Sequence, residues 1–251
     1  MQRHPFVDID GLANFRDVGG LDTADGIVRR GLLYRSDGLC QMTTAGRDAV
    51  ASLGIETIFD LRTSQELAEL PGPFPTVHVP LHEVFGQDDL ADSRLLSGRD
   101  EGEAWLQALY LLLLEQARPQ FRAIFETLAD RDRLPAIVHC AGGKDRTGLT
   151  VALVLCAVGV PRDVVLDDFA LQPSGTGWTR RRDAVHAQFV SNGIEEEVAN
   201  GLLSAPRWTM QDALASLDDT FGGIEEYLSR ACSLDPSILS GVRGNLVEDL
   251  R

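Results

Sequence analysis

The sequence predicts an α/β fold in which a central, mostly parallel sheet is flanked by helices. Short apolar segments rich in β-branched residues alternate with helix-like segments over the first 160 residues. One strand-like segment, PAIVHC, leads into a glycine-bearing turn and then into the apolar segment TGLTVALVLCAVG. Almost everything after Pro161 has a helical pattern. We therefore expect a single domain over residues 1–251, with a helical lid or insertion within residues 161–207 and a helical C-terminal region.

The first half of the chain contains the shorter elements. Turn residues in LANFRDVGG and IVRRGLLYRS predict short strands in a hairpin, with Asp25-Gly26 near the turn. One threonine of the Thr43-Thr44 pair is expected to cap a helix that ends at Gly54. The run ETIFDL predicts a buried strand, and Ser64 begins a short helix that ends in the prolines of residues 71–75. The segment TVHVP predicts a further strand.

The second half contains longer helices. Residues 82–103 are acidic and polar without clear periodicity, which predicts either a functional loop or a partly disordered lid. Helices are expected over residues 103–116 and 119–130, the second with proline in its first turn. Breaks in the helical pattern of the last third of the chain are expected near Pro173, Gly193 and Pro206.

Composition and charge exclude several classes of protein. The chain has 251 residues and a formal net charge of −15 at pH 7, so it repels polyanions and is not expected to bind nucleic acid. The longest apolar run, residues 104–114, is too short to cross a bilayer, so no integral membrane segment is expected. The N-terminus lacks the apolar stretch of a secretory signal, and the four cysteines are scattered. These features predict a cytoplasmic location.

The residues with the clearest chemistry form the segment HCAGGKDRTG, residues 139–148. Its expected architecture is strand, loop and helix, so the loop amides and the helix N-terminus can surround an anion. Cys140 and Arg146 stand at the two ends of the loop, with five residues between them. The guanidinium fork can hold two oxygens of a phosphate. The same positive field favours the thiolate form of Cys140, a nucleophile that can also leave again.

The other residues of this segment are expected to support the phosphate. The predicted phosphate-binding residues are Ala141, Gly142, Gly143, Lys144, Asp145 and Arg146. Thr147 can donate a hydrogen bond to the sulfur, and His139 is expected to order the loop rather than transfer protons. No metal or organic cofactor is expected, because the loop itself neutralises the phosphate charge.

The segment has two other possible interpretations. A nucleotide-binding P-loop is excluded, because the Gly143-Lys144 pair is followed by aspartate instead of serine or threonine. A purely structural cysteine at the end of a strand is the remaining alternative. It does not explain the histidine before Cys140, the glycine pair, the arginine and the Thr-Gly pair that follow.

The segment resembles the active-site signature of the cysteine-dependent tyrosine phosphatases. NFRDVGG, YRSDGL and FDLRT resemble upstream blocks of that family in the same order, and FGGIEEYL resembles its C-terminal helical region. The lysine and aspartate before the arginine are similar to those of a bacterial branch that includes mycobacterial and Listeria enzymes. The resemblance runs over nearly the whole chain, although only the cysteine loop is specific by itself. Ala141 and Gly142 differ from the usual residues of that branch, so the loop floor is expected to be more open.

The resemblance implies roles for individual residues. It implies a phosphocysteine intermediate and identifies Asp145 as the acid that protonates the leaving oxygen; the alternative is that Asp145 only orients Arg146. Fallback acids in the acidic stretch are Asp88, Asp89 and Asp92, which otherwise form a solvated face. Lys144 is the only lysine of the chain. It is expected to contact a second phosphate, as in enzymes that accept phosphoinositides, or the carboxylate of the acid, unless it is a codon accident on an exposed loop.

Three other groups of charged residues each have two possible interpretations. Asp60 and Arg62 end a predicted strand, where they either hold the cysteine loop or form a structural ion pair. Arg16 and Asp17 have the same two readings. The run Arg180-Arg181-Arg182 points in three directions on a helix, which favours a solvated helix face over a rim facing phosphate or lipid.

The expected activity is the hydrolysis of phosphate monoesters by a monomer or weak dimer. Phosphotyrosine proteins are the expected substrates, with phosphoserine, phosphothreonine and phosphoinositides as further ones. The resemblance also implies that the helical lid covers the pocket. Export by a route that needs no signal peptide remains an open alternative. Two alternatives remain. One is a module that recognises phosphorylated ligands without turnover. The other is a thiol-redox enzyme of the arsenate-reductase type, in which Cys40, Cys156 or Cys232 would be the resolving cysteine.

Overall fold

The computed structural model describes residues 6–83, 93–171, 173 and 176–249. Its main sheet has five strands in the order β1-β3-β6-β4-β5. Strands β3, β6, β4 and β5 run parallel, and β1 is an antiparallel strand at one edge. The strands are β1 (Arg16–Asp17), β3 (Leu33–Ser36), β4 (Thr57–Asp60), β5 (Val77–His78) and β6 (Ala136–His139). This topology confirms the predicted α/β fold with a mostly parallel sheet.

The parallel strands end at one level. Ser36 of β3 and Asp60 of β4 both lie opposite His139 of β6, and His78 of β5 lies opposite Asp60. An open α/β sheet binds its ligands at the carboxyl ends of its strands. Cys140 follows directly after His139, so the cysteine loop lies at this carboxyl edge.

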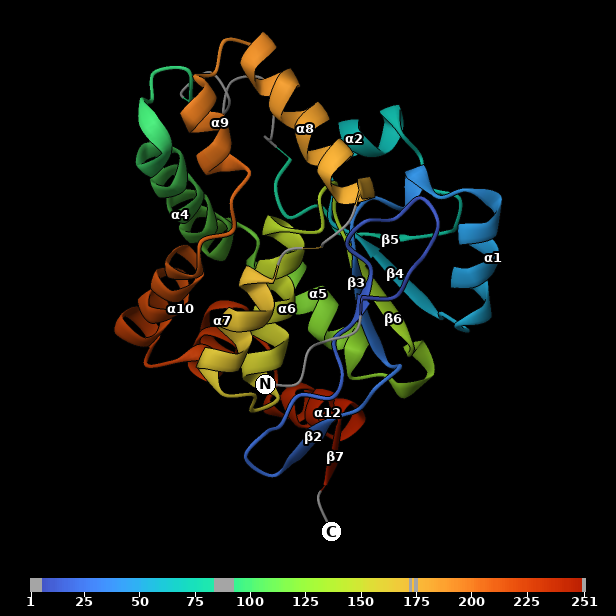
Figure 1. The fold of residues 1–251 in the computed structure, drawn as a ribbon. Coiled ribbons are helices and arrows are strands. Elements are labelled where there is room, and N and C mark those ends of the chain that lie inside the picture. The colour runs from blue at the N-terminus through green and yellow to red at the C-terminus, as the bar shows by residue number, and fades with distance from the viewer. Residues whose placement is uncertain (1–5, 84–92, 172, 174–175, 250–251) are drawn as a thin grey trace.

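Alternate residues of the central strands point to opposite faces of the sheet. Ile137 belongs to a small apolar cluster with Tyr34 and Ile58, whereas Val138 belongs to the large core on the other face. Helix α1 (Thr44–Ser52) lies on the side of the small cluster, and α5 and α6 lie on the side of the large core (Figure 1). Both faces of the sheet are therefore covered, as expected for parallel strands.

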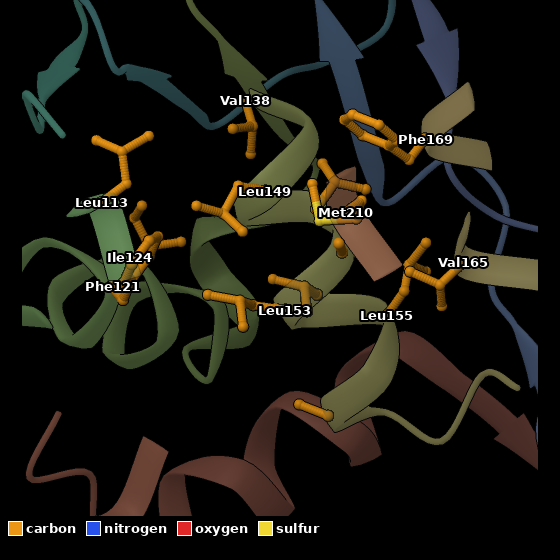
Figure 2. Close-up of a cluster of buried hydrophobic side chains, with 14 of the residues drawn as sticks. Leu113, Phe121, Ile124, Val138, Leu149, Leu153, Leu155, Val165, Phe169 and Met210 are labelled. Atoms are coloured by element: carbon orange, nitrogen blue, oxygen red, sulfur yellow. The ribbon is translucent and has the colours of Figure 1, made fainter. Parts of the chain in front are cut away.

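Helix α6 (Asp145–Ala157) runs through the large core, and nearly all of its side chains are buried. Figure 2 shows Leu149 and Leu153 of this helix on the side of Ile124, with Leu155 on the side of Val165. The helices around it are α4 (Gly98–Gln116), α5 (Arg118–Leu128), α7 (Arg162–Ala170) and α10 (Arg207–Phe221). A helix that is apolar all round is typical of such a buried position. The cysteine loop is therefore joined to a helix that the core holds firmly.

Local side chains set the start of two helices. At α1, Thr43 Oγ1 accepts a hydrogen bond from Gly46 N at 3.2 Å. At α2 (Ser64–Glu69), Thr63 Oγ1 accepts from Glu66 N at 3.1 Å and Glu66 Oε2 accepts from Thr63 N at 2.8 Å. The second arrangement is a capping box. Both helices begin where the sequence predicts them.

Helix α4 begins at Gly98, earlier than the start expected at residue 103. Glu101 Oε2 accepts from Ser97 N at 2.7 Å, and Glu195 Oε2 accepts from Gly98 N at 2.9 Å. Because Glu195 comes from a distant part of the chain, this helix start depends on tertiary structure. Of the acidic stretch before it, residues 84–92 lie outside the described residues.

The expected hairpin accounts for only part of the N-terminal strand pairing. The turn near Asp25-Gly26 is present, because Thr23 N donates to Gly26 O at 2.8 Å. The strand that follows, β2 (Gly26–Val28), pairs antiparallel with β7 (Val247–Asp249) at the other end of the chain. The C-terminal region is helical as predicted up to Leu246, and it ends in this short strand, which the sequence did not indicate.

The rest of the chain after Pro161 is mostly helical, with breaks near Pro173, Gly193 and Pro206 as expected. Its remaining helices are α8 (Thr176–Ser191), α9 (Glu196–Leu202), α11 (Ile224–Glu226) and α12 (Pro236–Leu246). Short irregular helical turns complete the chain at η1 (Leu39–Gln41), η2 (Arg131–Arg133) and η3 (Tyr227–Ala231). In Figure 1, α8 lies above the carboxyl edge of the sheet, whereas α7 packs beside α6. That residues 161–207 act as a lid stays a prediction. In the described residues, no helix combines the length and the apolar character needed to span a bilayer.

Candidate active site

Cys140 stands where β6 ends and the loop of residues 140–144 begins. Its side chain is buried, and α6 begins at Asp145. Gly143 has a φ of +64°, and a Cβ at this position would lie 2.5 Å from the carbonyl oxygen of Ser36. Both the left-handed conformation and the close approach to β3 therefore require glycine. The predicted order of strand, loop and helix is confirmed.

Residues of the N-terminal region hold the loop from outside. The side-chain amide of Asn14 donates to the carbonyl oxygens of Gly142 and Gly143, at 3.2 and 3.0 Å. Arg35 Nη2 donates to the carbonyl oxygen of Gly143 at 2.9 Å. A loop whose carbonyl oxygens are engaged on its outer side can direct its amides toward an anion on its inner side.

A buried ion cluster supports these donors. Asp168 of α7 pairs with Arg16, with 3.3 Å between Oδ1 and Nε, and with Arg35, with 2.7 Å between Oδ2 and Nη1. All three side chains are almost completely buried. Arg16 Nη1 also donates to Asn14 Oδ1 at 2.5 Å. Burial, together with the charge of Arg35, lowers the pKa of Arg16 to about 10, which still leaves it charged at neutral pH.

Asn14, Arg35 and Asp168 are not among the site residues predicted from the sequence. Asn14 and Arg35 lie within NFRDVGG and YRSDGL, and membership of these two blocks was the available signal. Asp168 lies in a helix with no comparable signal. Arg16 supports the loop through Asn14, which agrees with the interpretation that it helps to hold the cysteine loop.

Asp17 has a separate structural role. Its carboxylate accepts from Gly19 N at 2.8 Å and from Gly31 N at 2.9 Å. These bonds shape the turns on either side of β2 and do not reach the cysteine loop.

Arg146 is held by Glu66 of α2. Nη1 donates to Oε2 at 2.6 Å and Nη2 donates to Oε1 at 2.9 Å. Burial by itself would lower the pKa of the guanidinium, but the hydrogen bonds to Glu66 and the neighbouring negative charges together outweigh it and raise that pKa. Such a bidentate fork fixes the plane of the guanidinium. Glu66 is not among the residues predicted from the sequence, since its spacing from Thr63 indicates the capping box but not the contact with Arg146.

The carboxylate of Asp145 lies beside two donors. The hydroxyl of Tyr110 in α4 donates to Oδ1 at 2.6 Å, and Lys144 Nζ lies 3.2 Å from the same oxygen. Burial, followed by the nearby charge of Asp145, raises the pKa of Tyr110 well above its usual value, so the hydroxyl keeps its proton. Tyr110 is not among the residues predicted from the sequence, because it is one of many buried residues on the apolar face of its helix.

Lys144 joins the loop to the connection between α9 and α10. Its Nζ donates to the carbonyl oxygens of Leu202 and Ser204, at 2.6 and 2.5 Å. An ammonium group has three N–H donors, and the third neighbour here is the Asp145 carboxylate. The residue as a whole is only 9% exposed, so the interpretation as a lysine on an exposed loop was wrong. Of the two predicted contacts, the described residues include the one with the acid's carboxylate.

His139, Asp60 and Arg62 lie beneath the loop. His139 Nδ1 lies 3.3 Å from the carbonyl oxygen of Cys140, and Nε2 lies 3.7 Å from Asp60 Oδ2. Arg62 Nε and Nη2 donate to Asp60, at 2.9 Å to Oδ1 and 2.6 Å to Oδ2. Asp60 and Arg62 thus form a buried ion pair that meets the loop at His139. Burial lowers the pKa of His139 to about 4, so the imidazole is neutral at physiological pH and suited to ordering the loop.

We expect acid to lower the free energy of unfolding through His139. Between about pH 6.5 and about pH 4 the unfolded chain protonates this imidazole and the folded protein does not. The unfolded state then binds more protons, so stability is complete above pH 6.5 and falls as the pH falls, by at most about 3 kcal/mol. Urea unfolding near pH 7 and near pH 4.5 measures the difference. His139→Asn should reduce it; an unchanged pH dependence in this variant would assign the effect to carboxylates.

Two further predictions have different outcomes. The hydroxyl of Thr147 is buried and has no hydrogen-bond partner among the described residues, so donation to the sulfur stays a prediction. The fallback acids Asp88, Asp89 and Asp92 lie outside the described residues.

The arginine run of α8 is not a uniformly solvated face. Arg181 forms an ion pair with the buried Asp37, and its Nη2 donates to Gln41 Oε1 at 2.6 Å. Arg180 is exposed and Arg182 is half-buried beside Ala205. The prediction of a solvated face was therefore wrong for Arg181, which attaches α8 to the body of the protein.

The assembled site combines a thiol, a fixed cation and a carboxylate on one short loop. A phosphate ester bound in the loop would meet the sulfur of Cys140, the guanidinium of Arg146 and the carboxylate of Asp145. This is the constellation required to transfer a phosphoryl group to sulfur and to protonate the oxygen that leaves.

Comparison with known proteins agrees with this geometry. Residues 7–248 match the tyrosine phosphatase family. The chain is 30% identical to the triple specificity protein phosphatase PtpB of Mycobacterium tuberculosis, over 96% of this chain and 98% of that protein. It is 28% identical to a tyrosine-protein phosphatase of Nostoc commune, over 77% of this chain and 67% of that protein. With the family match extending over almost the whole chain, this protein is an enzyme of the tyrosine phosphatase family.

Proposed function

We propose that this enzyme hydrolyses phosphate monoesters through a phosphocysteine intermediate, with phosphotyrosine proteins as its main substrates. The observation that carries the proposal is the fixed geometry of the loop, with Cys140 at one end and Arg146, locked by Glu66, at the other. The thiolate attacks phosphorus in line with the leaving oxygen. Arg146 and the loop amides bind the equatorial oxygens, where negative charge is concentrated in the transition state.

Asp145 supplies and then recovers the proton. As the bond from phosphorus to the ester oxygen breaks, the carboxylic acid gives its proton to that oxygen, and the alcohol leaves. The resulting carboxylate then takes a proton from the water that attacks the phosphocysteine. This second attack breaks the sulfur–phosphorus bond, releases phosphate and restores the starting state.

The substrate range is the broader part of the proposal. The relative PtpB is named for triple specificity. We extend this breadth to the present chain, with phosphoserine, phosphothreonine and phosphoinositide substrates beside phosphotyrosine.

Binding without turnover and thiol-redox chemistry are the competing functions. A complete set of nucleophile, cation and acid disfavours the first. For the second, burial raises the pKa of Cys156 to about 12 and that of Cys232 to about 11, which keeps both thiols protonated. Only a thiolate attacks an oxidised partner cysteine rapidly, so neither is suited to a resolving role.

Phosphate release tests the proposal directly. We expect release from a phosphotyrosine peptide to exceed release from a phosphoserine peptide and from a monophosphorylated inositol lipid, with the same rates in the presence of EDTA. Asp145→Asn should lower kcat for the phosphotyrosine peptide about 100-fold, since general acid–base catalysis contributes about 10² to 10⁴. Near-normal rates in this variant would contradict the acid role. Binding of all three ligands without release would favour the recognition module.

A further inference from the structure

One oxygen of the Asp145 carboxylate both accepts the hydrogen bond of Tyr110 and lies within ion-pair distance of Lys144. Tyr110 donates its hydroxyl to Oδ1 at 2.6 Å, and Lys144 Nζ lies 3.2 Å from Oδ1. The ammonium has no lone pair to offer, so toward this carboxylate it acts only as a donor. The proton of a neutral Asp145 is therefore directed away from Oδ1.

The chemistry of a carboxylic acid makes this asymmetry meaningful. In the neutral acid, the carbonyl oxygen is the good hydrogen-bond acceptor and the other oxygen carries the proton. Two donors on Oδ1 favour the form in which Oδ1 is the carbonyl oxygen and Oδ2 is the hydroxyl. The side chain of Asp145 is 26% exposed, so a proton on Oδ2 can reach a bound ester.

Tyr110 itself is fixed by the core. Its side chain is fully buried in α4, and its ring packs edge to face on Phe169 of α7, with 5.9 Å between the ring centroids. Thr209 of α10 lies beside its hydroxyl, while the Thr209 hydroxyl itself donates to the carbonyl oxygen of Pro206 at 2.8 Å. A donor enclosed by three helices has little freedom to turn away, so its direction is set before a substrate binds.

We propose that Tyr110 is a positioning residue for the general acid: it holds Oδ1 as the acceptor and so places the transferable proton of Asp145 on Oδ2. The proposal rests on the proposed function, in which Asp145 is the acid. In the first step the sulfur–phosphorus bond forms and the bond from phosphorus to the ester oxygen breaks. The proton moves from Oδ2 to the departing oxygen, and Asp145 is left as a carboxylate.

The test is the dependence of kcat/KM on the leaving group. An acid matters most when the departing oxygen is a poor leaving group, so phenyl phosphate needs it more than p-nitrophenyl phosphate does. We expect Tyr110→Phe to lower kcat/KM about tenfold for phenyl phosphate and less than about twofold for p-nitrophenyl phosphate. The ratio of the two values within one preparation does not depend on how much of the protein is folded.

Tyr227→Phe is the matched control. Tyr227 is also fully buried, and its hydroxyl donates to the carbonyl oxygen of Leu114, again in α4, at 2.6 Å. Its loss removes a hydrogen bond of the same length without touching Asp145. The ratio of the two kcat/KM values should therefore stay at the wild-type level.

Asp145→Asn separates this inference from the proposed function. If Asp145→Asn and Tyr110→Phe both change the ratio, the positioning role is supported. A second outcome is that Asp145→Asn changes the ratio, whereas Tyr110→Phe lowers kcat/KM equally for the two substrates or lowers it for neither. Asp145 is then the acid, and the inference about Tyr110 is overturned. If Asp145→Asn leaves the ratio unchanged, the acid assignment itself fails, and the inference fails with it.

Discussion

Cys140→Ser is expected to reduce phosphate release by at least about 10⁴-fold, because a serine hydroxyl at this position has no means of becoming a nucleophile. The imidazole next to it in sequence cannot act as a base. His139 faces the carbonyl oxygen of Cys140 and the carboxylate of Asp60, and its pKa is lowered to about 4 by burial. A thiol ionises readily beside a cation and a helix N-terminus, whereas an alcohol does not.

The binding part of the site should survive this substitution. Arg146, its fork with Glu66 and the loop carbonyl contacts do not involve the sulfur. A nonhydrolysable phosphonate analogue of a phosphotyrosine peptide should therefore bind to Cys140→Ser with wild-type affinity within about threefold, as measured by isothermal titration calorimetry.

Cys40→Ser is the control for this experiment. The Cys40 sulfur lies 3.9 Å from Arg62 Nη1, near the site but outside the loop. We expect this variant to keep its turnover. Loss of activity in Cys40→Ser, or turnover by Cys140→Ser within tenfold of the wild type, would contradict the assignment of the nucleophile.

Asp168→Asn is expected to lower the free energy of unfolding by about 3 to 5 kcal/mol. The substitution removes the negative charge between Arg16 and Arg35, and both guanidinium groups are buried. Two uncompensated positive charges would then remain in the interior, where water cannot solvate them. Urea unfolding at neutral pH measures the loss.

Asp163→Asn is a matched control in the same helix. Asp163 pairs with Arg207 across 2.8 Å, but the Asp163 side chain is 89% exposed. Water and salt screen such a pair, so the midpoint of urea unfolding should stay unchanged. Equal destabilisation by the two variants would show that burial of the ion cluster is not what stabilises it.

Features that depend on neighbours in the chain were predictable from sequence. The loop from Cys140 to Arg146 is continuous, so its spacing alone indicates an anion-binding turn with a thiol. The starts of α1 and α2 depend on Thr43 and Thr63, which bond to amides three residues ahead. The alternation of strands and helices likewise predicted the parallel sheet. In each case the interacting groups are only a few residues apart in the chain, so the interaction can be predicted from the sequence.

Contacts between distant segments were decided by the tertiary structure. Glu66 meets Arg146, Tyr110 meets Asp145, and β2 finds its partner strand at the C-terminus. Lys144 was expected to offer its charge to a phosphate or to the acid, yet it also binds one carbonyl oxygen at the end of α9 and one just after it. Such partners meet only when the hydrophobic core forms. Burial then determines which charged groups need a hydrogen-bond or ion-pair partner, and the fold determines which residue provides it. The sequence by itself indicated the residues that we propose react in this enzyme, and the tertiary structure decided what holds each of them in place.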